Sequence, residues 1–423
     1  MRATRRFFLG AAAAGLAAAR AQAAPSERIR VGFIGCGGMG TARIRQFLGH
    51  ADVEAAAVCD VDRNHLERAA ALVEKETGRK PAAFADFRRL LERGDIDAVM
   101  IATPDHWHAL PAILACEAGK DVFVEKPFSW SVGEGRRMVE AARRRRRVTQ
   151  MGNHIHNDLP NYRRVVELVR SGRLGRIVRV HCGLASGEKS IGSPPDGPPP
   201  PELDYDFWLG PAPKRPYNPN RSHGKFRYFW DYSGGYFADF WCHYADVAYW
   251  ALDLKAPRAV SAAGGRWLAE DNAETPDVFE AVLEYPGPVL LTWTQHPRGR
   301  PGFEHMGSCV VFEGTEATLV TNYSKHEVWV KGKPAPDFPR PEPSIPDSPG
   351  HIREFLDAIK ARNTETTCNF EYSHRLNKGA LLANLAFRLG ARLEWDDERE
   401  RVTNHREANS RLTRRYRKPW KLA

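Results

Sequence analysis

The chain has 423 residues, of which 42% are hydrophobic and 27% charged, enough to form two domains with separate hydrophobic cores. Its formal net charge of +10 is a modest excess for this length, and it does not indicate a nucleic-acid-binding protein. The seven cysteines lie singly, without a C-x-x-C pair, and their number is odd, so the sequence predicts neither a disulfide framework nor a zinc site.

The first 25 residues have the features of an export signal. Residues 4–9 read Thr-Arg-Arg-Phe-Phe-Leu, residues 10–19 are apolar and rich in alanine, and residues 21–23 offer a small-x-small cleavage site. The apolar run is too short to span a bilayer permanently. We therefore expect export by the Tat pathway to the periplasm, as a protein that first folds in the reducing cytosol.

A glycine-rich turn follows the first predicted strand, Ile29–Ile34. Gly35, Gly37 and Gly40 have the spacing of a G-x-G-x-x-G fingerprint, with Gly38 and Met39 between the last two. In such a turn the first glycine allows a tight bend, the second lets a pyrophosphate approach the backbone, and the third lets the helix pack on its strand. The pattern predicts a dinucleotide site at the start of a helix.

Asp60 directly follows a second predicted strand at residues 53–59. It lies about twenty residues beyond the glycines, where an acidic side chain accepts a hydrogen bond from the adenosine ribose. A carboxylate there repels a 2′-phosphate, so NAD is expected as the cofactor. Arg63 leaves NADP possible, and a glycine turn without a nucleotide is the structural alternative.

Strands and helices continue to alternate up to residue 152, which is typical of a doubly wound parallel sheet with its ligand at the carboxyl ends of the strands. We therefore expect an α/β Rossmann domain over residues 26–152. The remaining predicted helices lie around 62–76, 87–93, 110–118 and 131–147, and the remaining strands at 96–102, 121–125 and 148–151.

Polar and aromatic residues follow two of these strands. Thr103, Pro104, Trp107 and His108 come after one, and Glu125-Lys126-Pro127 after the next. Together with the glycine turn, the patterns T-P-x-x-x-H and E-K-P resemble the Gfo/Idh/MocA oxidoreductases, the family of glucose–fructose oxidoreductase and inositol dehydrogenase. The resemblance extends from about Ile29 to the C-terminus, and it implies that Trp107 and His108 lie near the cofactor ring.

Residues 153–423 are expected to form an α+β domain for substrate binding and oligomerisation, with a large, mostly antiparallel open sheet, as the family has. A proline-rich segment, 193–221, carries Tyr205, Phe207, Trp208 and Tyr217, and it should pack as a wall over the substrate or against another subunit. A homodimer or homotetramer is expected. Predicted strands lie at 176–182, 259–263, 278–285, 289–294, 308–312, 317–321 and 327–330, predicted helices at 160–170, 352–361 and 374–389, and a basic tail follows.

A second signature contains Asp239, His243 and Asp246 after Gly234-Gly235. Asp239 and His243 are spaced i to i+4 and share one helical face, so the carboxylate can orient the imidazole. Oxidation of an alcohol needs a base for the hydroxyl proton and a cation for the developing alkoxide. The resemblance implies that Lys126, Asp239 and His243 are the catalytic residues, with His243 as acid/base.

Two other interpretations of this pair remain: a structural hydrogen bond, or a metal site completed by His156 or His181. No third ligand stands at a motif spacing, so no metal is predicted. Trp241, where many relatives have a small residue, is expected to narrow or reshape the sugar pocket. The residues expected on the cofactor are Gly35, Gly37, Gly38, Met39, Gly40, Asp60, Thr103, Pro104, His108, Glu125 and Lys126, and those expected on the substrate are Trp107, Lys126, Asn153, His154, His156, Asp239 and His243.

The expected activity is NAD(P)-dependent oxidation of a sugar, sugar derivative or cyclitol. Because the periplasm has no dependable pool of free NAD, the nucleotide should be held tightly and regenerated within the site. One alternative is redox-neutral glycoside cleavage through a transient keto-sugar, as in the exported NAD-dependent glycosidases of the superfamily. That branch tends to lack the lysine of E-K-P, whereas this chain has Lys126. The other alternative is a nucleotide-bearing sugar-binding protein without turnover.

Overall fold

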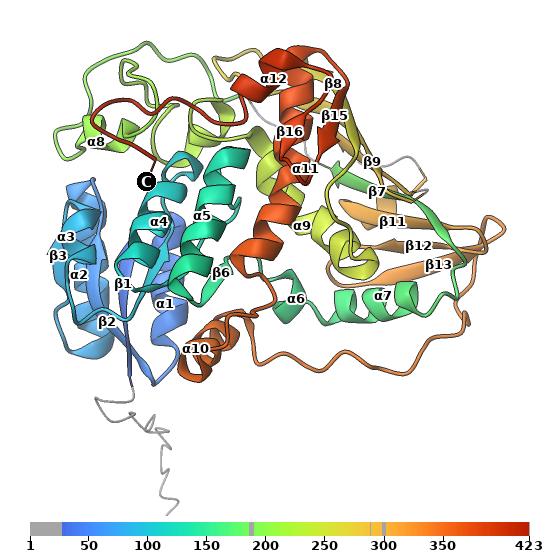
Figure 1. The fold of residues 1–423 in the computed structure, drawn as a ribbon, viewed down its shortest axis with the longest axis horizontal. Coiled ribbons are helices and arrows are strands. Elements are labelled where there is room, and N and C mark those ends of the chain that lie inside the picture. Colours follow the sequence, from blue (N-terminus) through green and yellow to red (C-terminus); the bar gives the residue numbers. More distant parts are fainter. Residues whose placement is uncertain (1–27, 186–189, 288, 298–301, 423) are drawn as a thin grey trace, which may run out of the picture.

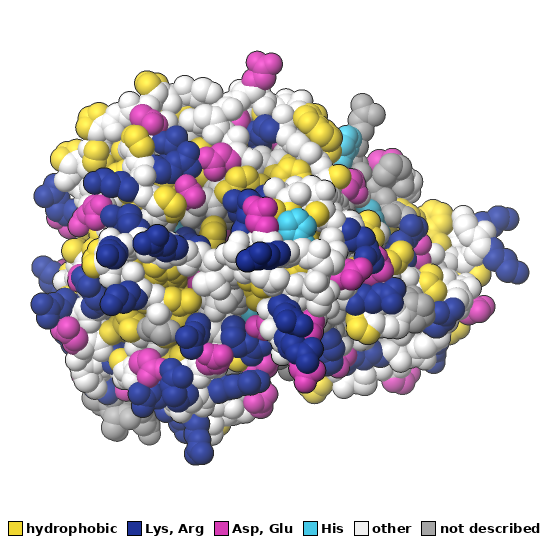
Figure 2. Space-filling view, turned by 45° about the horizontal axis from the view of Figure 1, so that its top comes forward, with side chains coloured by type: hydrophobic (Ala, Val, Ile, Leu, Met, Phe, Trp, Pro, Cys, Tyr) yellow, Lys and Arg dark blue, Asp and Glu magenta, His cyan; other side chains and the backbone are white. Residues whose placement is uncertain are grey.

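The computed structural model describes residues 28–185, 190–287, 289–297 and 302–422, and the predicted export signal lies outside them. The chain forms two α/β lobes joined along a long helix, α11 (Phe370–Leu389) (Figure 1). Lysine and arginine side chains spread across the face seen in Figure 2, with acidic side chains among them. None of the helices in the described part of the chain has the length and apolar character needed to cross a membrane.

The first lobe contains a six-stranded parallel sheet in the order β3-β2-β1-β4-β5-β6. The order reverses between β1 and β4, the position at which doubly wound sheets bind ligands. Its strands are β1 (Ile29–Ile34), β2 (Val53–Cys59), β3 (Ala82–Phe84), β4 (Ala98–Ile101), β5 (Asp121–Val124) and β6 (Thr149–Met151), and its helices are α1 (Gly38–Leu48), α2 (Arg63–Thr77), α3 (Phe87–Leu91), α4 (Ala109–Glu117) and α5 (Val132–Arg145).

Side-chain caps explain where two of these helices begin. The Asp62 carboxylate accepts a hydrogen bond from the His65 backbone N–H at 3.0 Å and starts α2, and Ser131 caps α5 through the Glu134 N–H. The arginines in the last turn of α5 pair with acids, Arg144 and Arg145 with Glu117, beside the helix C-terminus where cations are favoured.

The second lobe contains a ten-stranded sheet in the order β14-β13-β12-β11-β7-β10-β9-β8-β15-β16. Its neighbours are antiparallel except for β7 and β10. Its strands are β7 (Ile177–Ala185), β8 (Ala259–Gly265), β9 (Val278–Tyr285), β10 (Val289–His296), β11 (Cys309–Gly314), β12 (Thr318–Thr321), β13 (His326–Val330), β14 (Lys333–Pro334), β15 (Leu393–Asp396) and β16 (Arg401–Val402). The predicted fold class, a doubly wound parallel sheet followed by a mostly antiparallel sheet, is confirmed.

Helices α7 (Pro160–Arg170), α9 (Gly235–Leu252) and α11 pack against one another and the second sheet. The core between them holds the fully buried rings of Trp241, Trp293 and Tyr285. The remaining helices are α6 (Ile155–Asp158), α8 (Tyr205–Leu209), α10 (His351–Ala361) and α12 (Arg406–Ser410). Helix α10 packs on the first lobe, where Phe355 contacts Phe47 and Phe123.

The C-terminal segment, which the sequence analysis described only as a basic tail, packs on the first lobe. After β15, β16 and α12, the chain runs back over the first lobe (Figure 1). Arg414 forms a buried ion pair with Glu134 at 3.0 Å, and the Trp420 ring packs against Trp107 with centroids 4.8 Å apart. Two segments beyond residue 152, α10 and residues 411–422, therefore pack on the first lobe, and the predicted boundary at residue 152 stays a prediction.

Candidate functional site

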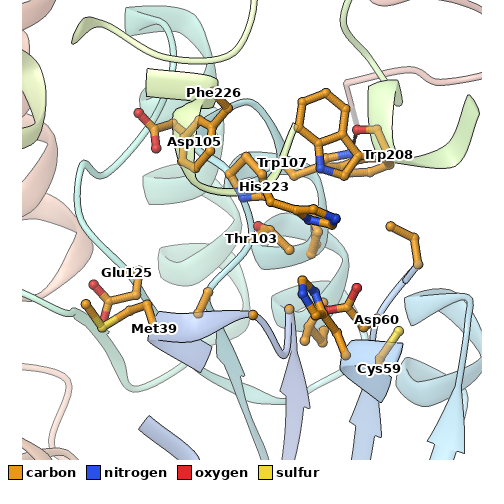
Figure 3. Close-up of a pocket in the computed structure, with 18 of the residues that line it drawn as sticks. Met39, Cys59, Asp60, Thr103, Asp105, Trp107, Glu125, Trp208, His223 and Phe226 are labelled. Atoms are coloured by element: carbon orange, nitrogen blue, oxygen red, sulfur yellow. Dashed lines mark hydrogen bonds and ion pairs between the residues drawn. The ribbon is translucent and has the colours of Figure 1, made fainter. Parts of the chain in front are cut away.

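A cavity of about 450 Å³ opens at the carboxyl ends of β1, β2, β4 and β5 (Figure 3). It is the position at which an open α/β sheet binds its ligand. Of the predicted cofactor residues, those that line the cavity are Gly35, Gly37, Gly38, Met39, Asp60, Thr103, Pro104, Glu125 and Lys126.

The glycine turn fits a bound pyrophosphate. Gly35 has φ +85°, and a side chain there would meet the Ala102 backbone at 2.7 Å. A Cβ on Gly40 would lie 1.8 Å from the Gly35 carbonyl oxygen, so Gly40 allows α1 to pack on its strand. Around Gly38 no atom of the described chain lies within 4 Å of such a Cβ, which leaves the backbone open to the cavity beside the N-terminus of α1.

Asp60 holds the glycine turn as well as facing the cavity. Its Oδ2 accepts the Cys36 N–H at 2.6 Å and its Oδ1 accepts the Asp62 N–H at 2.8 Å. Each carboxylate oxygen keeps a second lone pair, which is available to a ribose hydroxyl. Arg63, which left NADP possible, is not among the lining residues of the cavity. These residues fit NAD.

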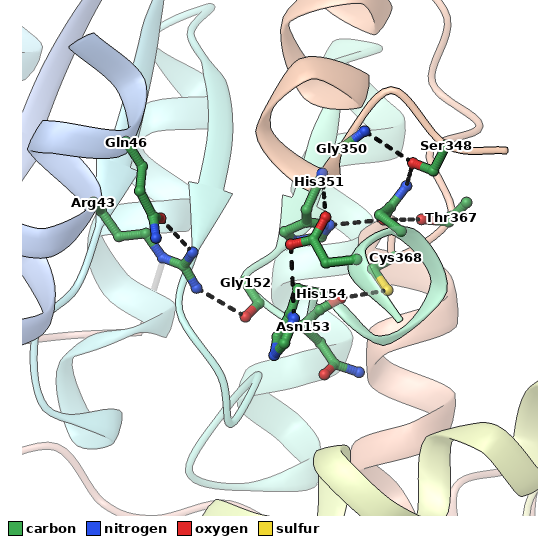
Figure 4. Close-up of polar contacts among 12 residues, drawn as sticks. Arg43, Gln46, Gly152, Asn153, His154, Ser348, Gly350, His351, Thr367 and Cys368 are labelled. Atoms are coloured by element: carbon green, nitrogen blue, oxygen red, sulfur yellow. Dashed lines mark hydrogen bonds and ion pairs between the residues drawn. The ribbon is translucent and has the colours of Figure 1, made fainter. Parts of the chain in front are cut away.

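Glu125 is positioned by an arginine that sequence motifs did not reveal. Arg43, on α1, donates from Nε to Glu125 Oε1 at 2.5 Å. It also donates from Nη2 to the Gly152 carbonyl at 3.3 Å, a contact drawn in Figure 4. A side chain at position 152 would lie 2.6 Å from Glu125 Oε1, so the glycine is needed for this close approach. The buried carboxylate is thereby fixed at the cavity floor.

His108 does not face the cofactor cavity, contrary to the prediction. The ring is buried, with Nδ1 2.7 Å from the Pro127 carbonyl oxygen and Nε2 2.9 Å from that of Thr103. It therefore ties the loop after β4 to the cis Lys126–Pro127 turn after β5. The nearby Thr103 hydroxyl is buried without a hydrogen-bond partner in the described chain, and it lines the cavity.

Trp107 belongs to an aromatic wall rather than to the predicted substrate group. Its ring stacks on Phe207 with centroids 5.6 Å apart, and its Nε1 donates to the Trp208 carbonyl at 2.8 Å. It also contacts Phe87 at the start of α3. The proline-rich segment, predicted as a wall over the substrate, thus walls the nucleotide cavity with Phe207 and Trp208.

Lys126 and Asp239 form the centre of the site. The Lys126 ammonium lies 2.6 Å from Asp239 Oδ1, and both side chains are about nine-tenths buried. Arg227 approaches the same oxygen at 3.1 Å and lines the cavity. Burial alone would raise the pKa of Asp239, but Lys126 and Arg227 outweigh it and lower the pKa to about 2. Asp239 is therefore a charged acceptor that holds two cations.

His243 follows one helical turn later on α9. Burial and the Lys126 charge, against the opposite effect of Asp239, lower its pKa to about 3. The imidazole is neutral at physiological pH, and its Nδ1 is buried with no hydrogen-bond partner in the described chain. The His154 ring lies 6.1 Å from it, centroid to centroid. His154 is half-buried, and its role as a substrate residue stays a prediction.

Asn153 and His156 turn away from this site. Both contact Asp246, Asn153 through Nδ2 at 2.8 Å and His156 through Nε2 at 3.1 Å, and Tyr372 donates to the same carboxylate. His156 also stacks on Trp250 with centroids 4.2 Å apart. The placement of His156 as a substrate residue was therefore wrong, because its ring belongs to a buried network behind α9. Asn153 contributes its Nδ2 to the same network, and its role in substrate binding stays a prediction.

Aromatic side chains form a stripe beside His243 that the sequence motifs did not indicate. Tyr236, Phe240 and Tyr244 follow one another at i, i+4 and i+8 on α9, and Tyr323 stacks on Tyr244 with centroids 5.5 Å apart. Their spacing in the sequence was the available signal. Trp241 was wrongly expected in the pocket, because its ring is fully buried against Gly379 and donates to the Leu376 carbonyl.

The fold and this site define a two-lobed protein with an NAD-binding Rossmann domain and a lysine–aspartate pair at the end of its sheet. The chain belongs to the Gfo/Idh/MocA family. The model of the "oxidoreductase family, NAD-binding Rossmann fold" matches residues 29–153, and that of its C-terminal alpha/beta domain matches residues 163–266 and 311–422.

Curated relatives are similar over a shorter stretch. The chain is 37% identical over 160 residues to glycosyl hydrolase family 109 protein 1 of Shewanella sp. (strain ANA-3), and 36% identical over 160 residues to alpha-N-acetylgalactosaminidase of Shewanella oneidensis. Each match covers 36% of this chain and 34% of the relative, so the chain spans about a third of their length.

Among solved structures, the WlbA dehydrogenase of Bordetella pertussis in complex with NADH and UDP-GlcNAcA has the same fold. The TM-score is 0.62 at 20% identity, over 87% of this chain and 99% of the other. This likeness concerns the fold of both lobes.

Proposed function

We propose that this protein oxidises a hydroxyl group of a sugar, sugar derivative or cyclitol. The observation that carries the proposal is the buried Lys126–Asp239 pair beside neutral His243, with Lys126 lining the same cavity as the glycine turn. NAD, when bound, supplies the hydride acceptor. In the aromatic stripe next to His243, Tyr236 and Phe240 are half-buried, which supports a carbohydrate because the C–H faces of sugar rings pack against aromatic rings.

His243, Lys126 and Asp239 have separate roles in removing the hydroxyl proton. Neutral His243 accepts the proton, and the Lys126 ammonium holds the oxygen as its negative charge develops. Asp239 holds Lys126 in place through the 2.6 Å contact, and Arg227 contacts the same carboxylate oxygen at 3.1 Å. Burial of the lysine and aspartate removes competing water, which strengthens these electrostatic interactions.

A second candidate is redox-neutral cleavage of a glycoside through transient oxidation of the sugar. The names of the two Shewanella relatives favour it. The same three residues would act in both reactions, because both begin with loss of a hydroxyl proton. Retention of Lys126 favours net oxidation.

The test starts with full-length protein purified without added nucleotide. Denaturation should release about one NAD(H) per chain, identified by absorbance and mass. The protein is then incubated with single sugars, sugar pairs and nitrophenyl glycosides. Carbonyl product without nitrophenol supports net oxidation, and nitrophenol without net change in NADH supports the second candidate. A protein that retains NAD and converts none of these compounds would instead be a binding protein, and the proposal would fail.

We also propose that the protein is exported by the Tat pathway and assembles as a homodimer or homotetramer. The twin arginine of residues 4–9 supports export, and the large second sheet supports assembly. A reporter fused after residue 25, with both arginines changed to lysine as the control, tests the export signal. Light scattering of the purified protein measures the oligomeric state.

A further inference from the structure

Two histidines and an aspartate meet at the rim of the cofactor cavity. Asp62, His65 and His223 each place one donor atom within 4.8 Å of the other two. His223 Nε2 lies 3.3 Å from Asp62 Oδ2, and the two imidazole rings have centroids 4.6 Å apart. His223 and Asp60 face one another across the cavity (Figure 3), and His65 and His223 both line it. Neither the nucleotide fingerprint nor the Lys126 site uses this cluster.

The fold holds these three residues in place from two distant parts of the chain. Asp62 caps α2 through Oδ1, which leaves Oδ2 directed at His223. Residues 202–204 lie beside the same turn, where Arg63 N–H donates to the Glu202 carbonyl and Asp204 N–H to the Val61 carbonyl, both at 3.0 Å. The chain returns twenty residues later with His223, whose φ of +50° is uncommon for a residue with a side chain.

The donor set and its spacing suit a transition metal. Two imidazoles and a carboxylate are ligands that zinc prefers, and two donors on one tetrahedral zinc ion at about 2.1 Å lie about 3.4 Å apart. The 3.3 Å between His223 Nε2 and Asp62 Oδ2 matches that separation. The half-exposed His223 leaves room for a water ligand. Asp60, 3.7 Å from His65, adds negative charge.

A second group of potential metal ligands is less favourable for a metal ion. His156, Asp246 and Cys368 are also close together, but all three are buried. The Asp246 carboxylate already accepts hydrogen bonds from Asn153 and Tyr372 and contacts His156. A metal there would have to displace these partners.

We propose that Asp62, His65 and His223 bind one divalent transition-metal ion of the zinc type, and that this ion holds the segment 202–223 against the nucleotide domain. The segment carries Phe207 and Trp208 of the cavity wall. With the ion bound, the wall stays closed at the Asp60 end of the cavity and NAD leaves slowly. This effect of the metal ion on NAD release requires only nucleotide binding, so it does not depend on which reaction occurs at Lys126.

The first experiment measures metal binding directly. Full-length protein is dialysed against EDTA and titrated with ZnCl₂ by calorimetry, and with CoCl₂ while visible absorption bands of bound cobalt are followed. We expect one ion per chain in the wild type and loss of that ion in H65Q and H223N. Asparagine tolerates positive φ, so H223N should fold, which circular dichroism checks. H305N is the matched control, because His305 forms a comparable exposed pair with Glu327 on the second lobe.

The second experiment follows release of NADH by its fluorescence. Zinc should slow release about tenfold in the wild type, within the range usual for two coupled sites, and should have no effect in H223N. By thermodynamic reciprocity, NADH must tighten zinc binding by the factor by which zinc tightens NADH binding.

Three results would overturn the inference. They are absence of stoichiometric binding in the wild type, unchanged binding in both H65Q and H223N, and zinc binding that leaves the rate of NADH release unchanged. None of these measurements requires turnover, so failure of the proposed sugar oxidation would not affect them.

Discussion

Replacing Lys126 by methionine tests the centre of the site, because methionine keeps most of the side-chain volume and removes the charge. The pKa of Asp239 falls from 3.8 to about 2 in the folded protein, and at about 1.4 kcal/mol per unit Lys126 and Arg227 stabilise the carboxylate by a net amount on the order of 2 kcal/mol. Asp239 is buried, so solvent does not screen this term appreciably. In K126M only Arg227, at 3.1 Å, remains beside Asp239.

We expect K126M to lower kcat by about 10²- to 10³-fold, the usual effect of removing one positioned donor to a developing oxyanion. Bound NAD should be unchanged, because the glycine turn and Asp60 are held by contacts without Lys126. Released nucleotide is quantified beside initial rates on the best sugar. K120M is the matched control, since Lys120 is a buried lysine of the same domain that donates to backbone carbonyls. A kcat for K126M within threefold of the wild type would refute the assignment.

Three further changes should have measurable effects. The pKa of His243 is lowered to about 3 in the folded protein, so below about pH 6.5 His243 binds a proton in the unfolded chain but not in the folded one. The free energy of unfolding of the wild type, measured with urea, should therefore fall by about 2 kcal/mol between pH 8 and pH 5. H243Q should not show this fall. R414M should cost about 3–5 kcal/mol, since it leaves Glu134 buried without its cation, whereas R411M, at an exposed pair, should cost under about 1 kcal/mol. Y236A should raise KM for the sugar and leave the NAD content unchanged, as measured by initial rates and by released nucleotide.

The first lobe could be predicted almost completely from the sequence. Its strands are buried on both faces, so β4 and β5 appear as continuous apolar runs, and the glycine turn fixes where the first helix begins. The exception, β3, has only three residues, two of them alanine, and it carries no periodic signal. The order of the second sheet was beyond prediction, because its pairings join segments far apart in the chain.

Charged partners from distant segments explain most of what the sequence missed at the site. Lys126 and Asp239 stand in recognisable motifs, but Arg227 reaches Asp239 from the end of a proline-rich segment, and Arg43 reaches Glu125 from the exposed side of a helix pattern. A basic residue without a motif looks the same in sequence whether it faces solvent or a buried carboxylate.

Two histidines were assigned to the site by the sequence analysis but do not face it. His108 and His156 follow strands, as functional residues do, yet both side chains are buried. Their ring nitrogens form contacts with the Pro127 and Thr103 carbonyls and with Asp246. His154, two residues from His156, instead has its ring 6.1 Å from that of His243, centroid to centroid. Neighbours in a short helical turn face different directions, and only the packing around them decides which one meets the substrate.

The electrostatics of the site indicate which group takes the proton. Asp239, with a pKa of about 2 and two cations beside it, is a weak base, and the Lys126 ammonium is engaged in the ion pair. His243 is neutral and has an unpaired Nδ1, and its low pKa is a property of the site before substrate binds. Negative charge that develops on a hydroxyl held between Lys126 and His243 favours the imidazolium and raises the pKa of His243 as the proton is transferred. In the resting protein the Lys126 charge makes His243 a weaker base. The developing alkoxide offsets that charge as the proton is transferred. The lysine must therefore lie beside His243 and be fixed there by Asp239.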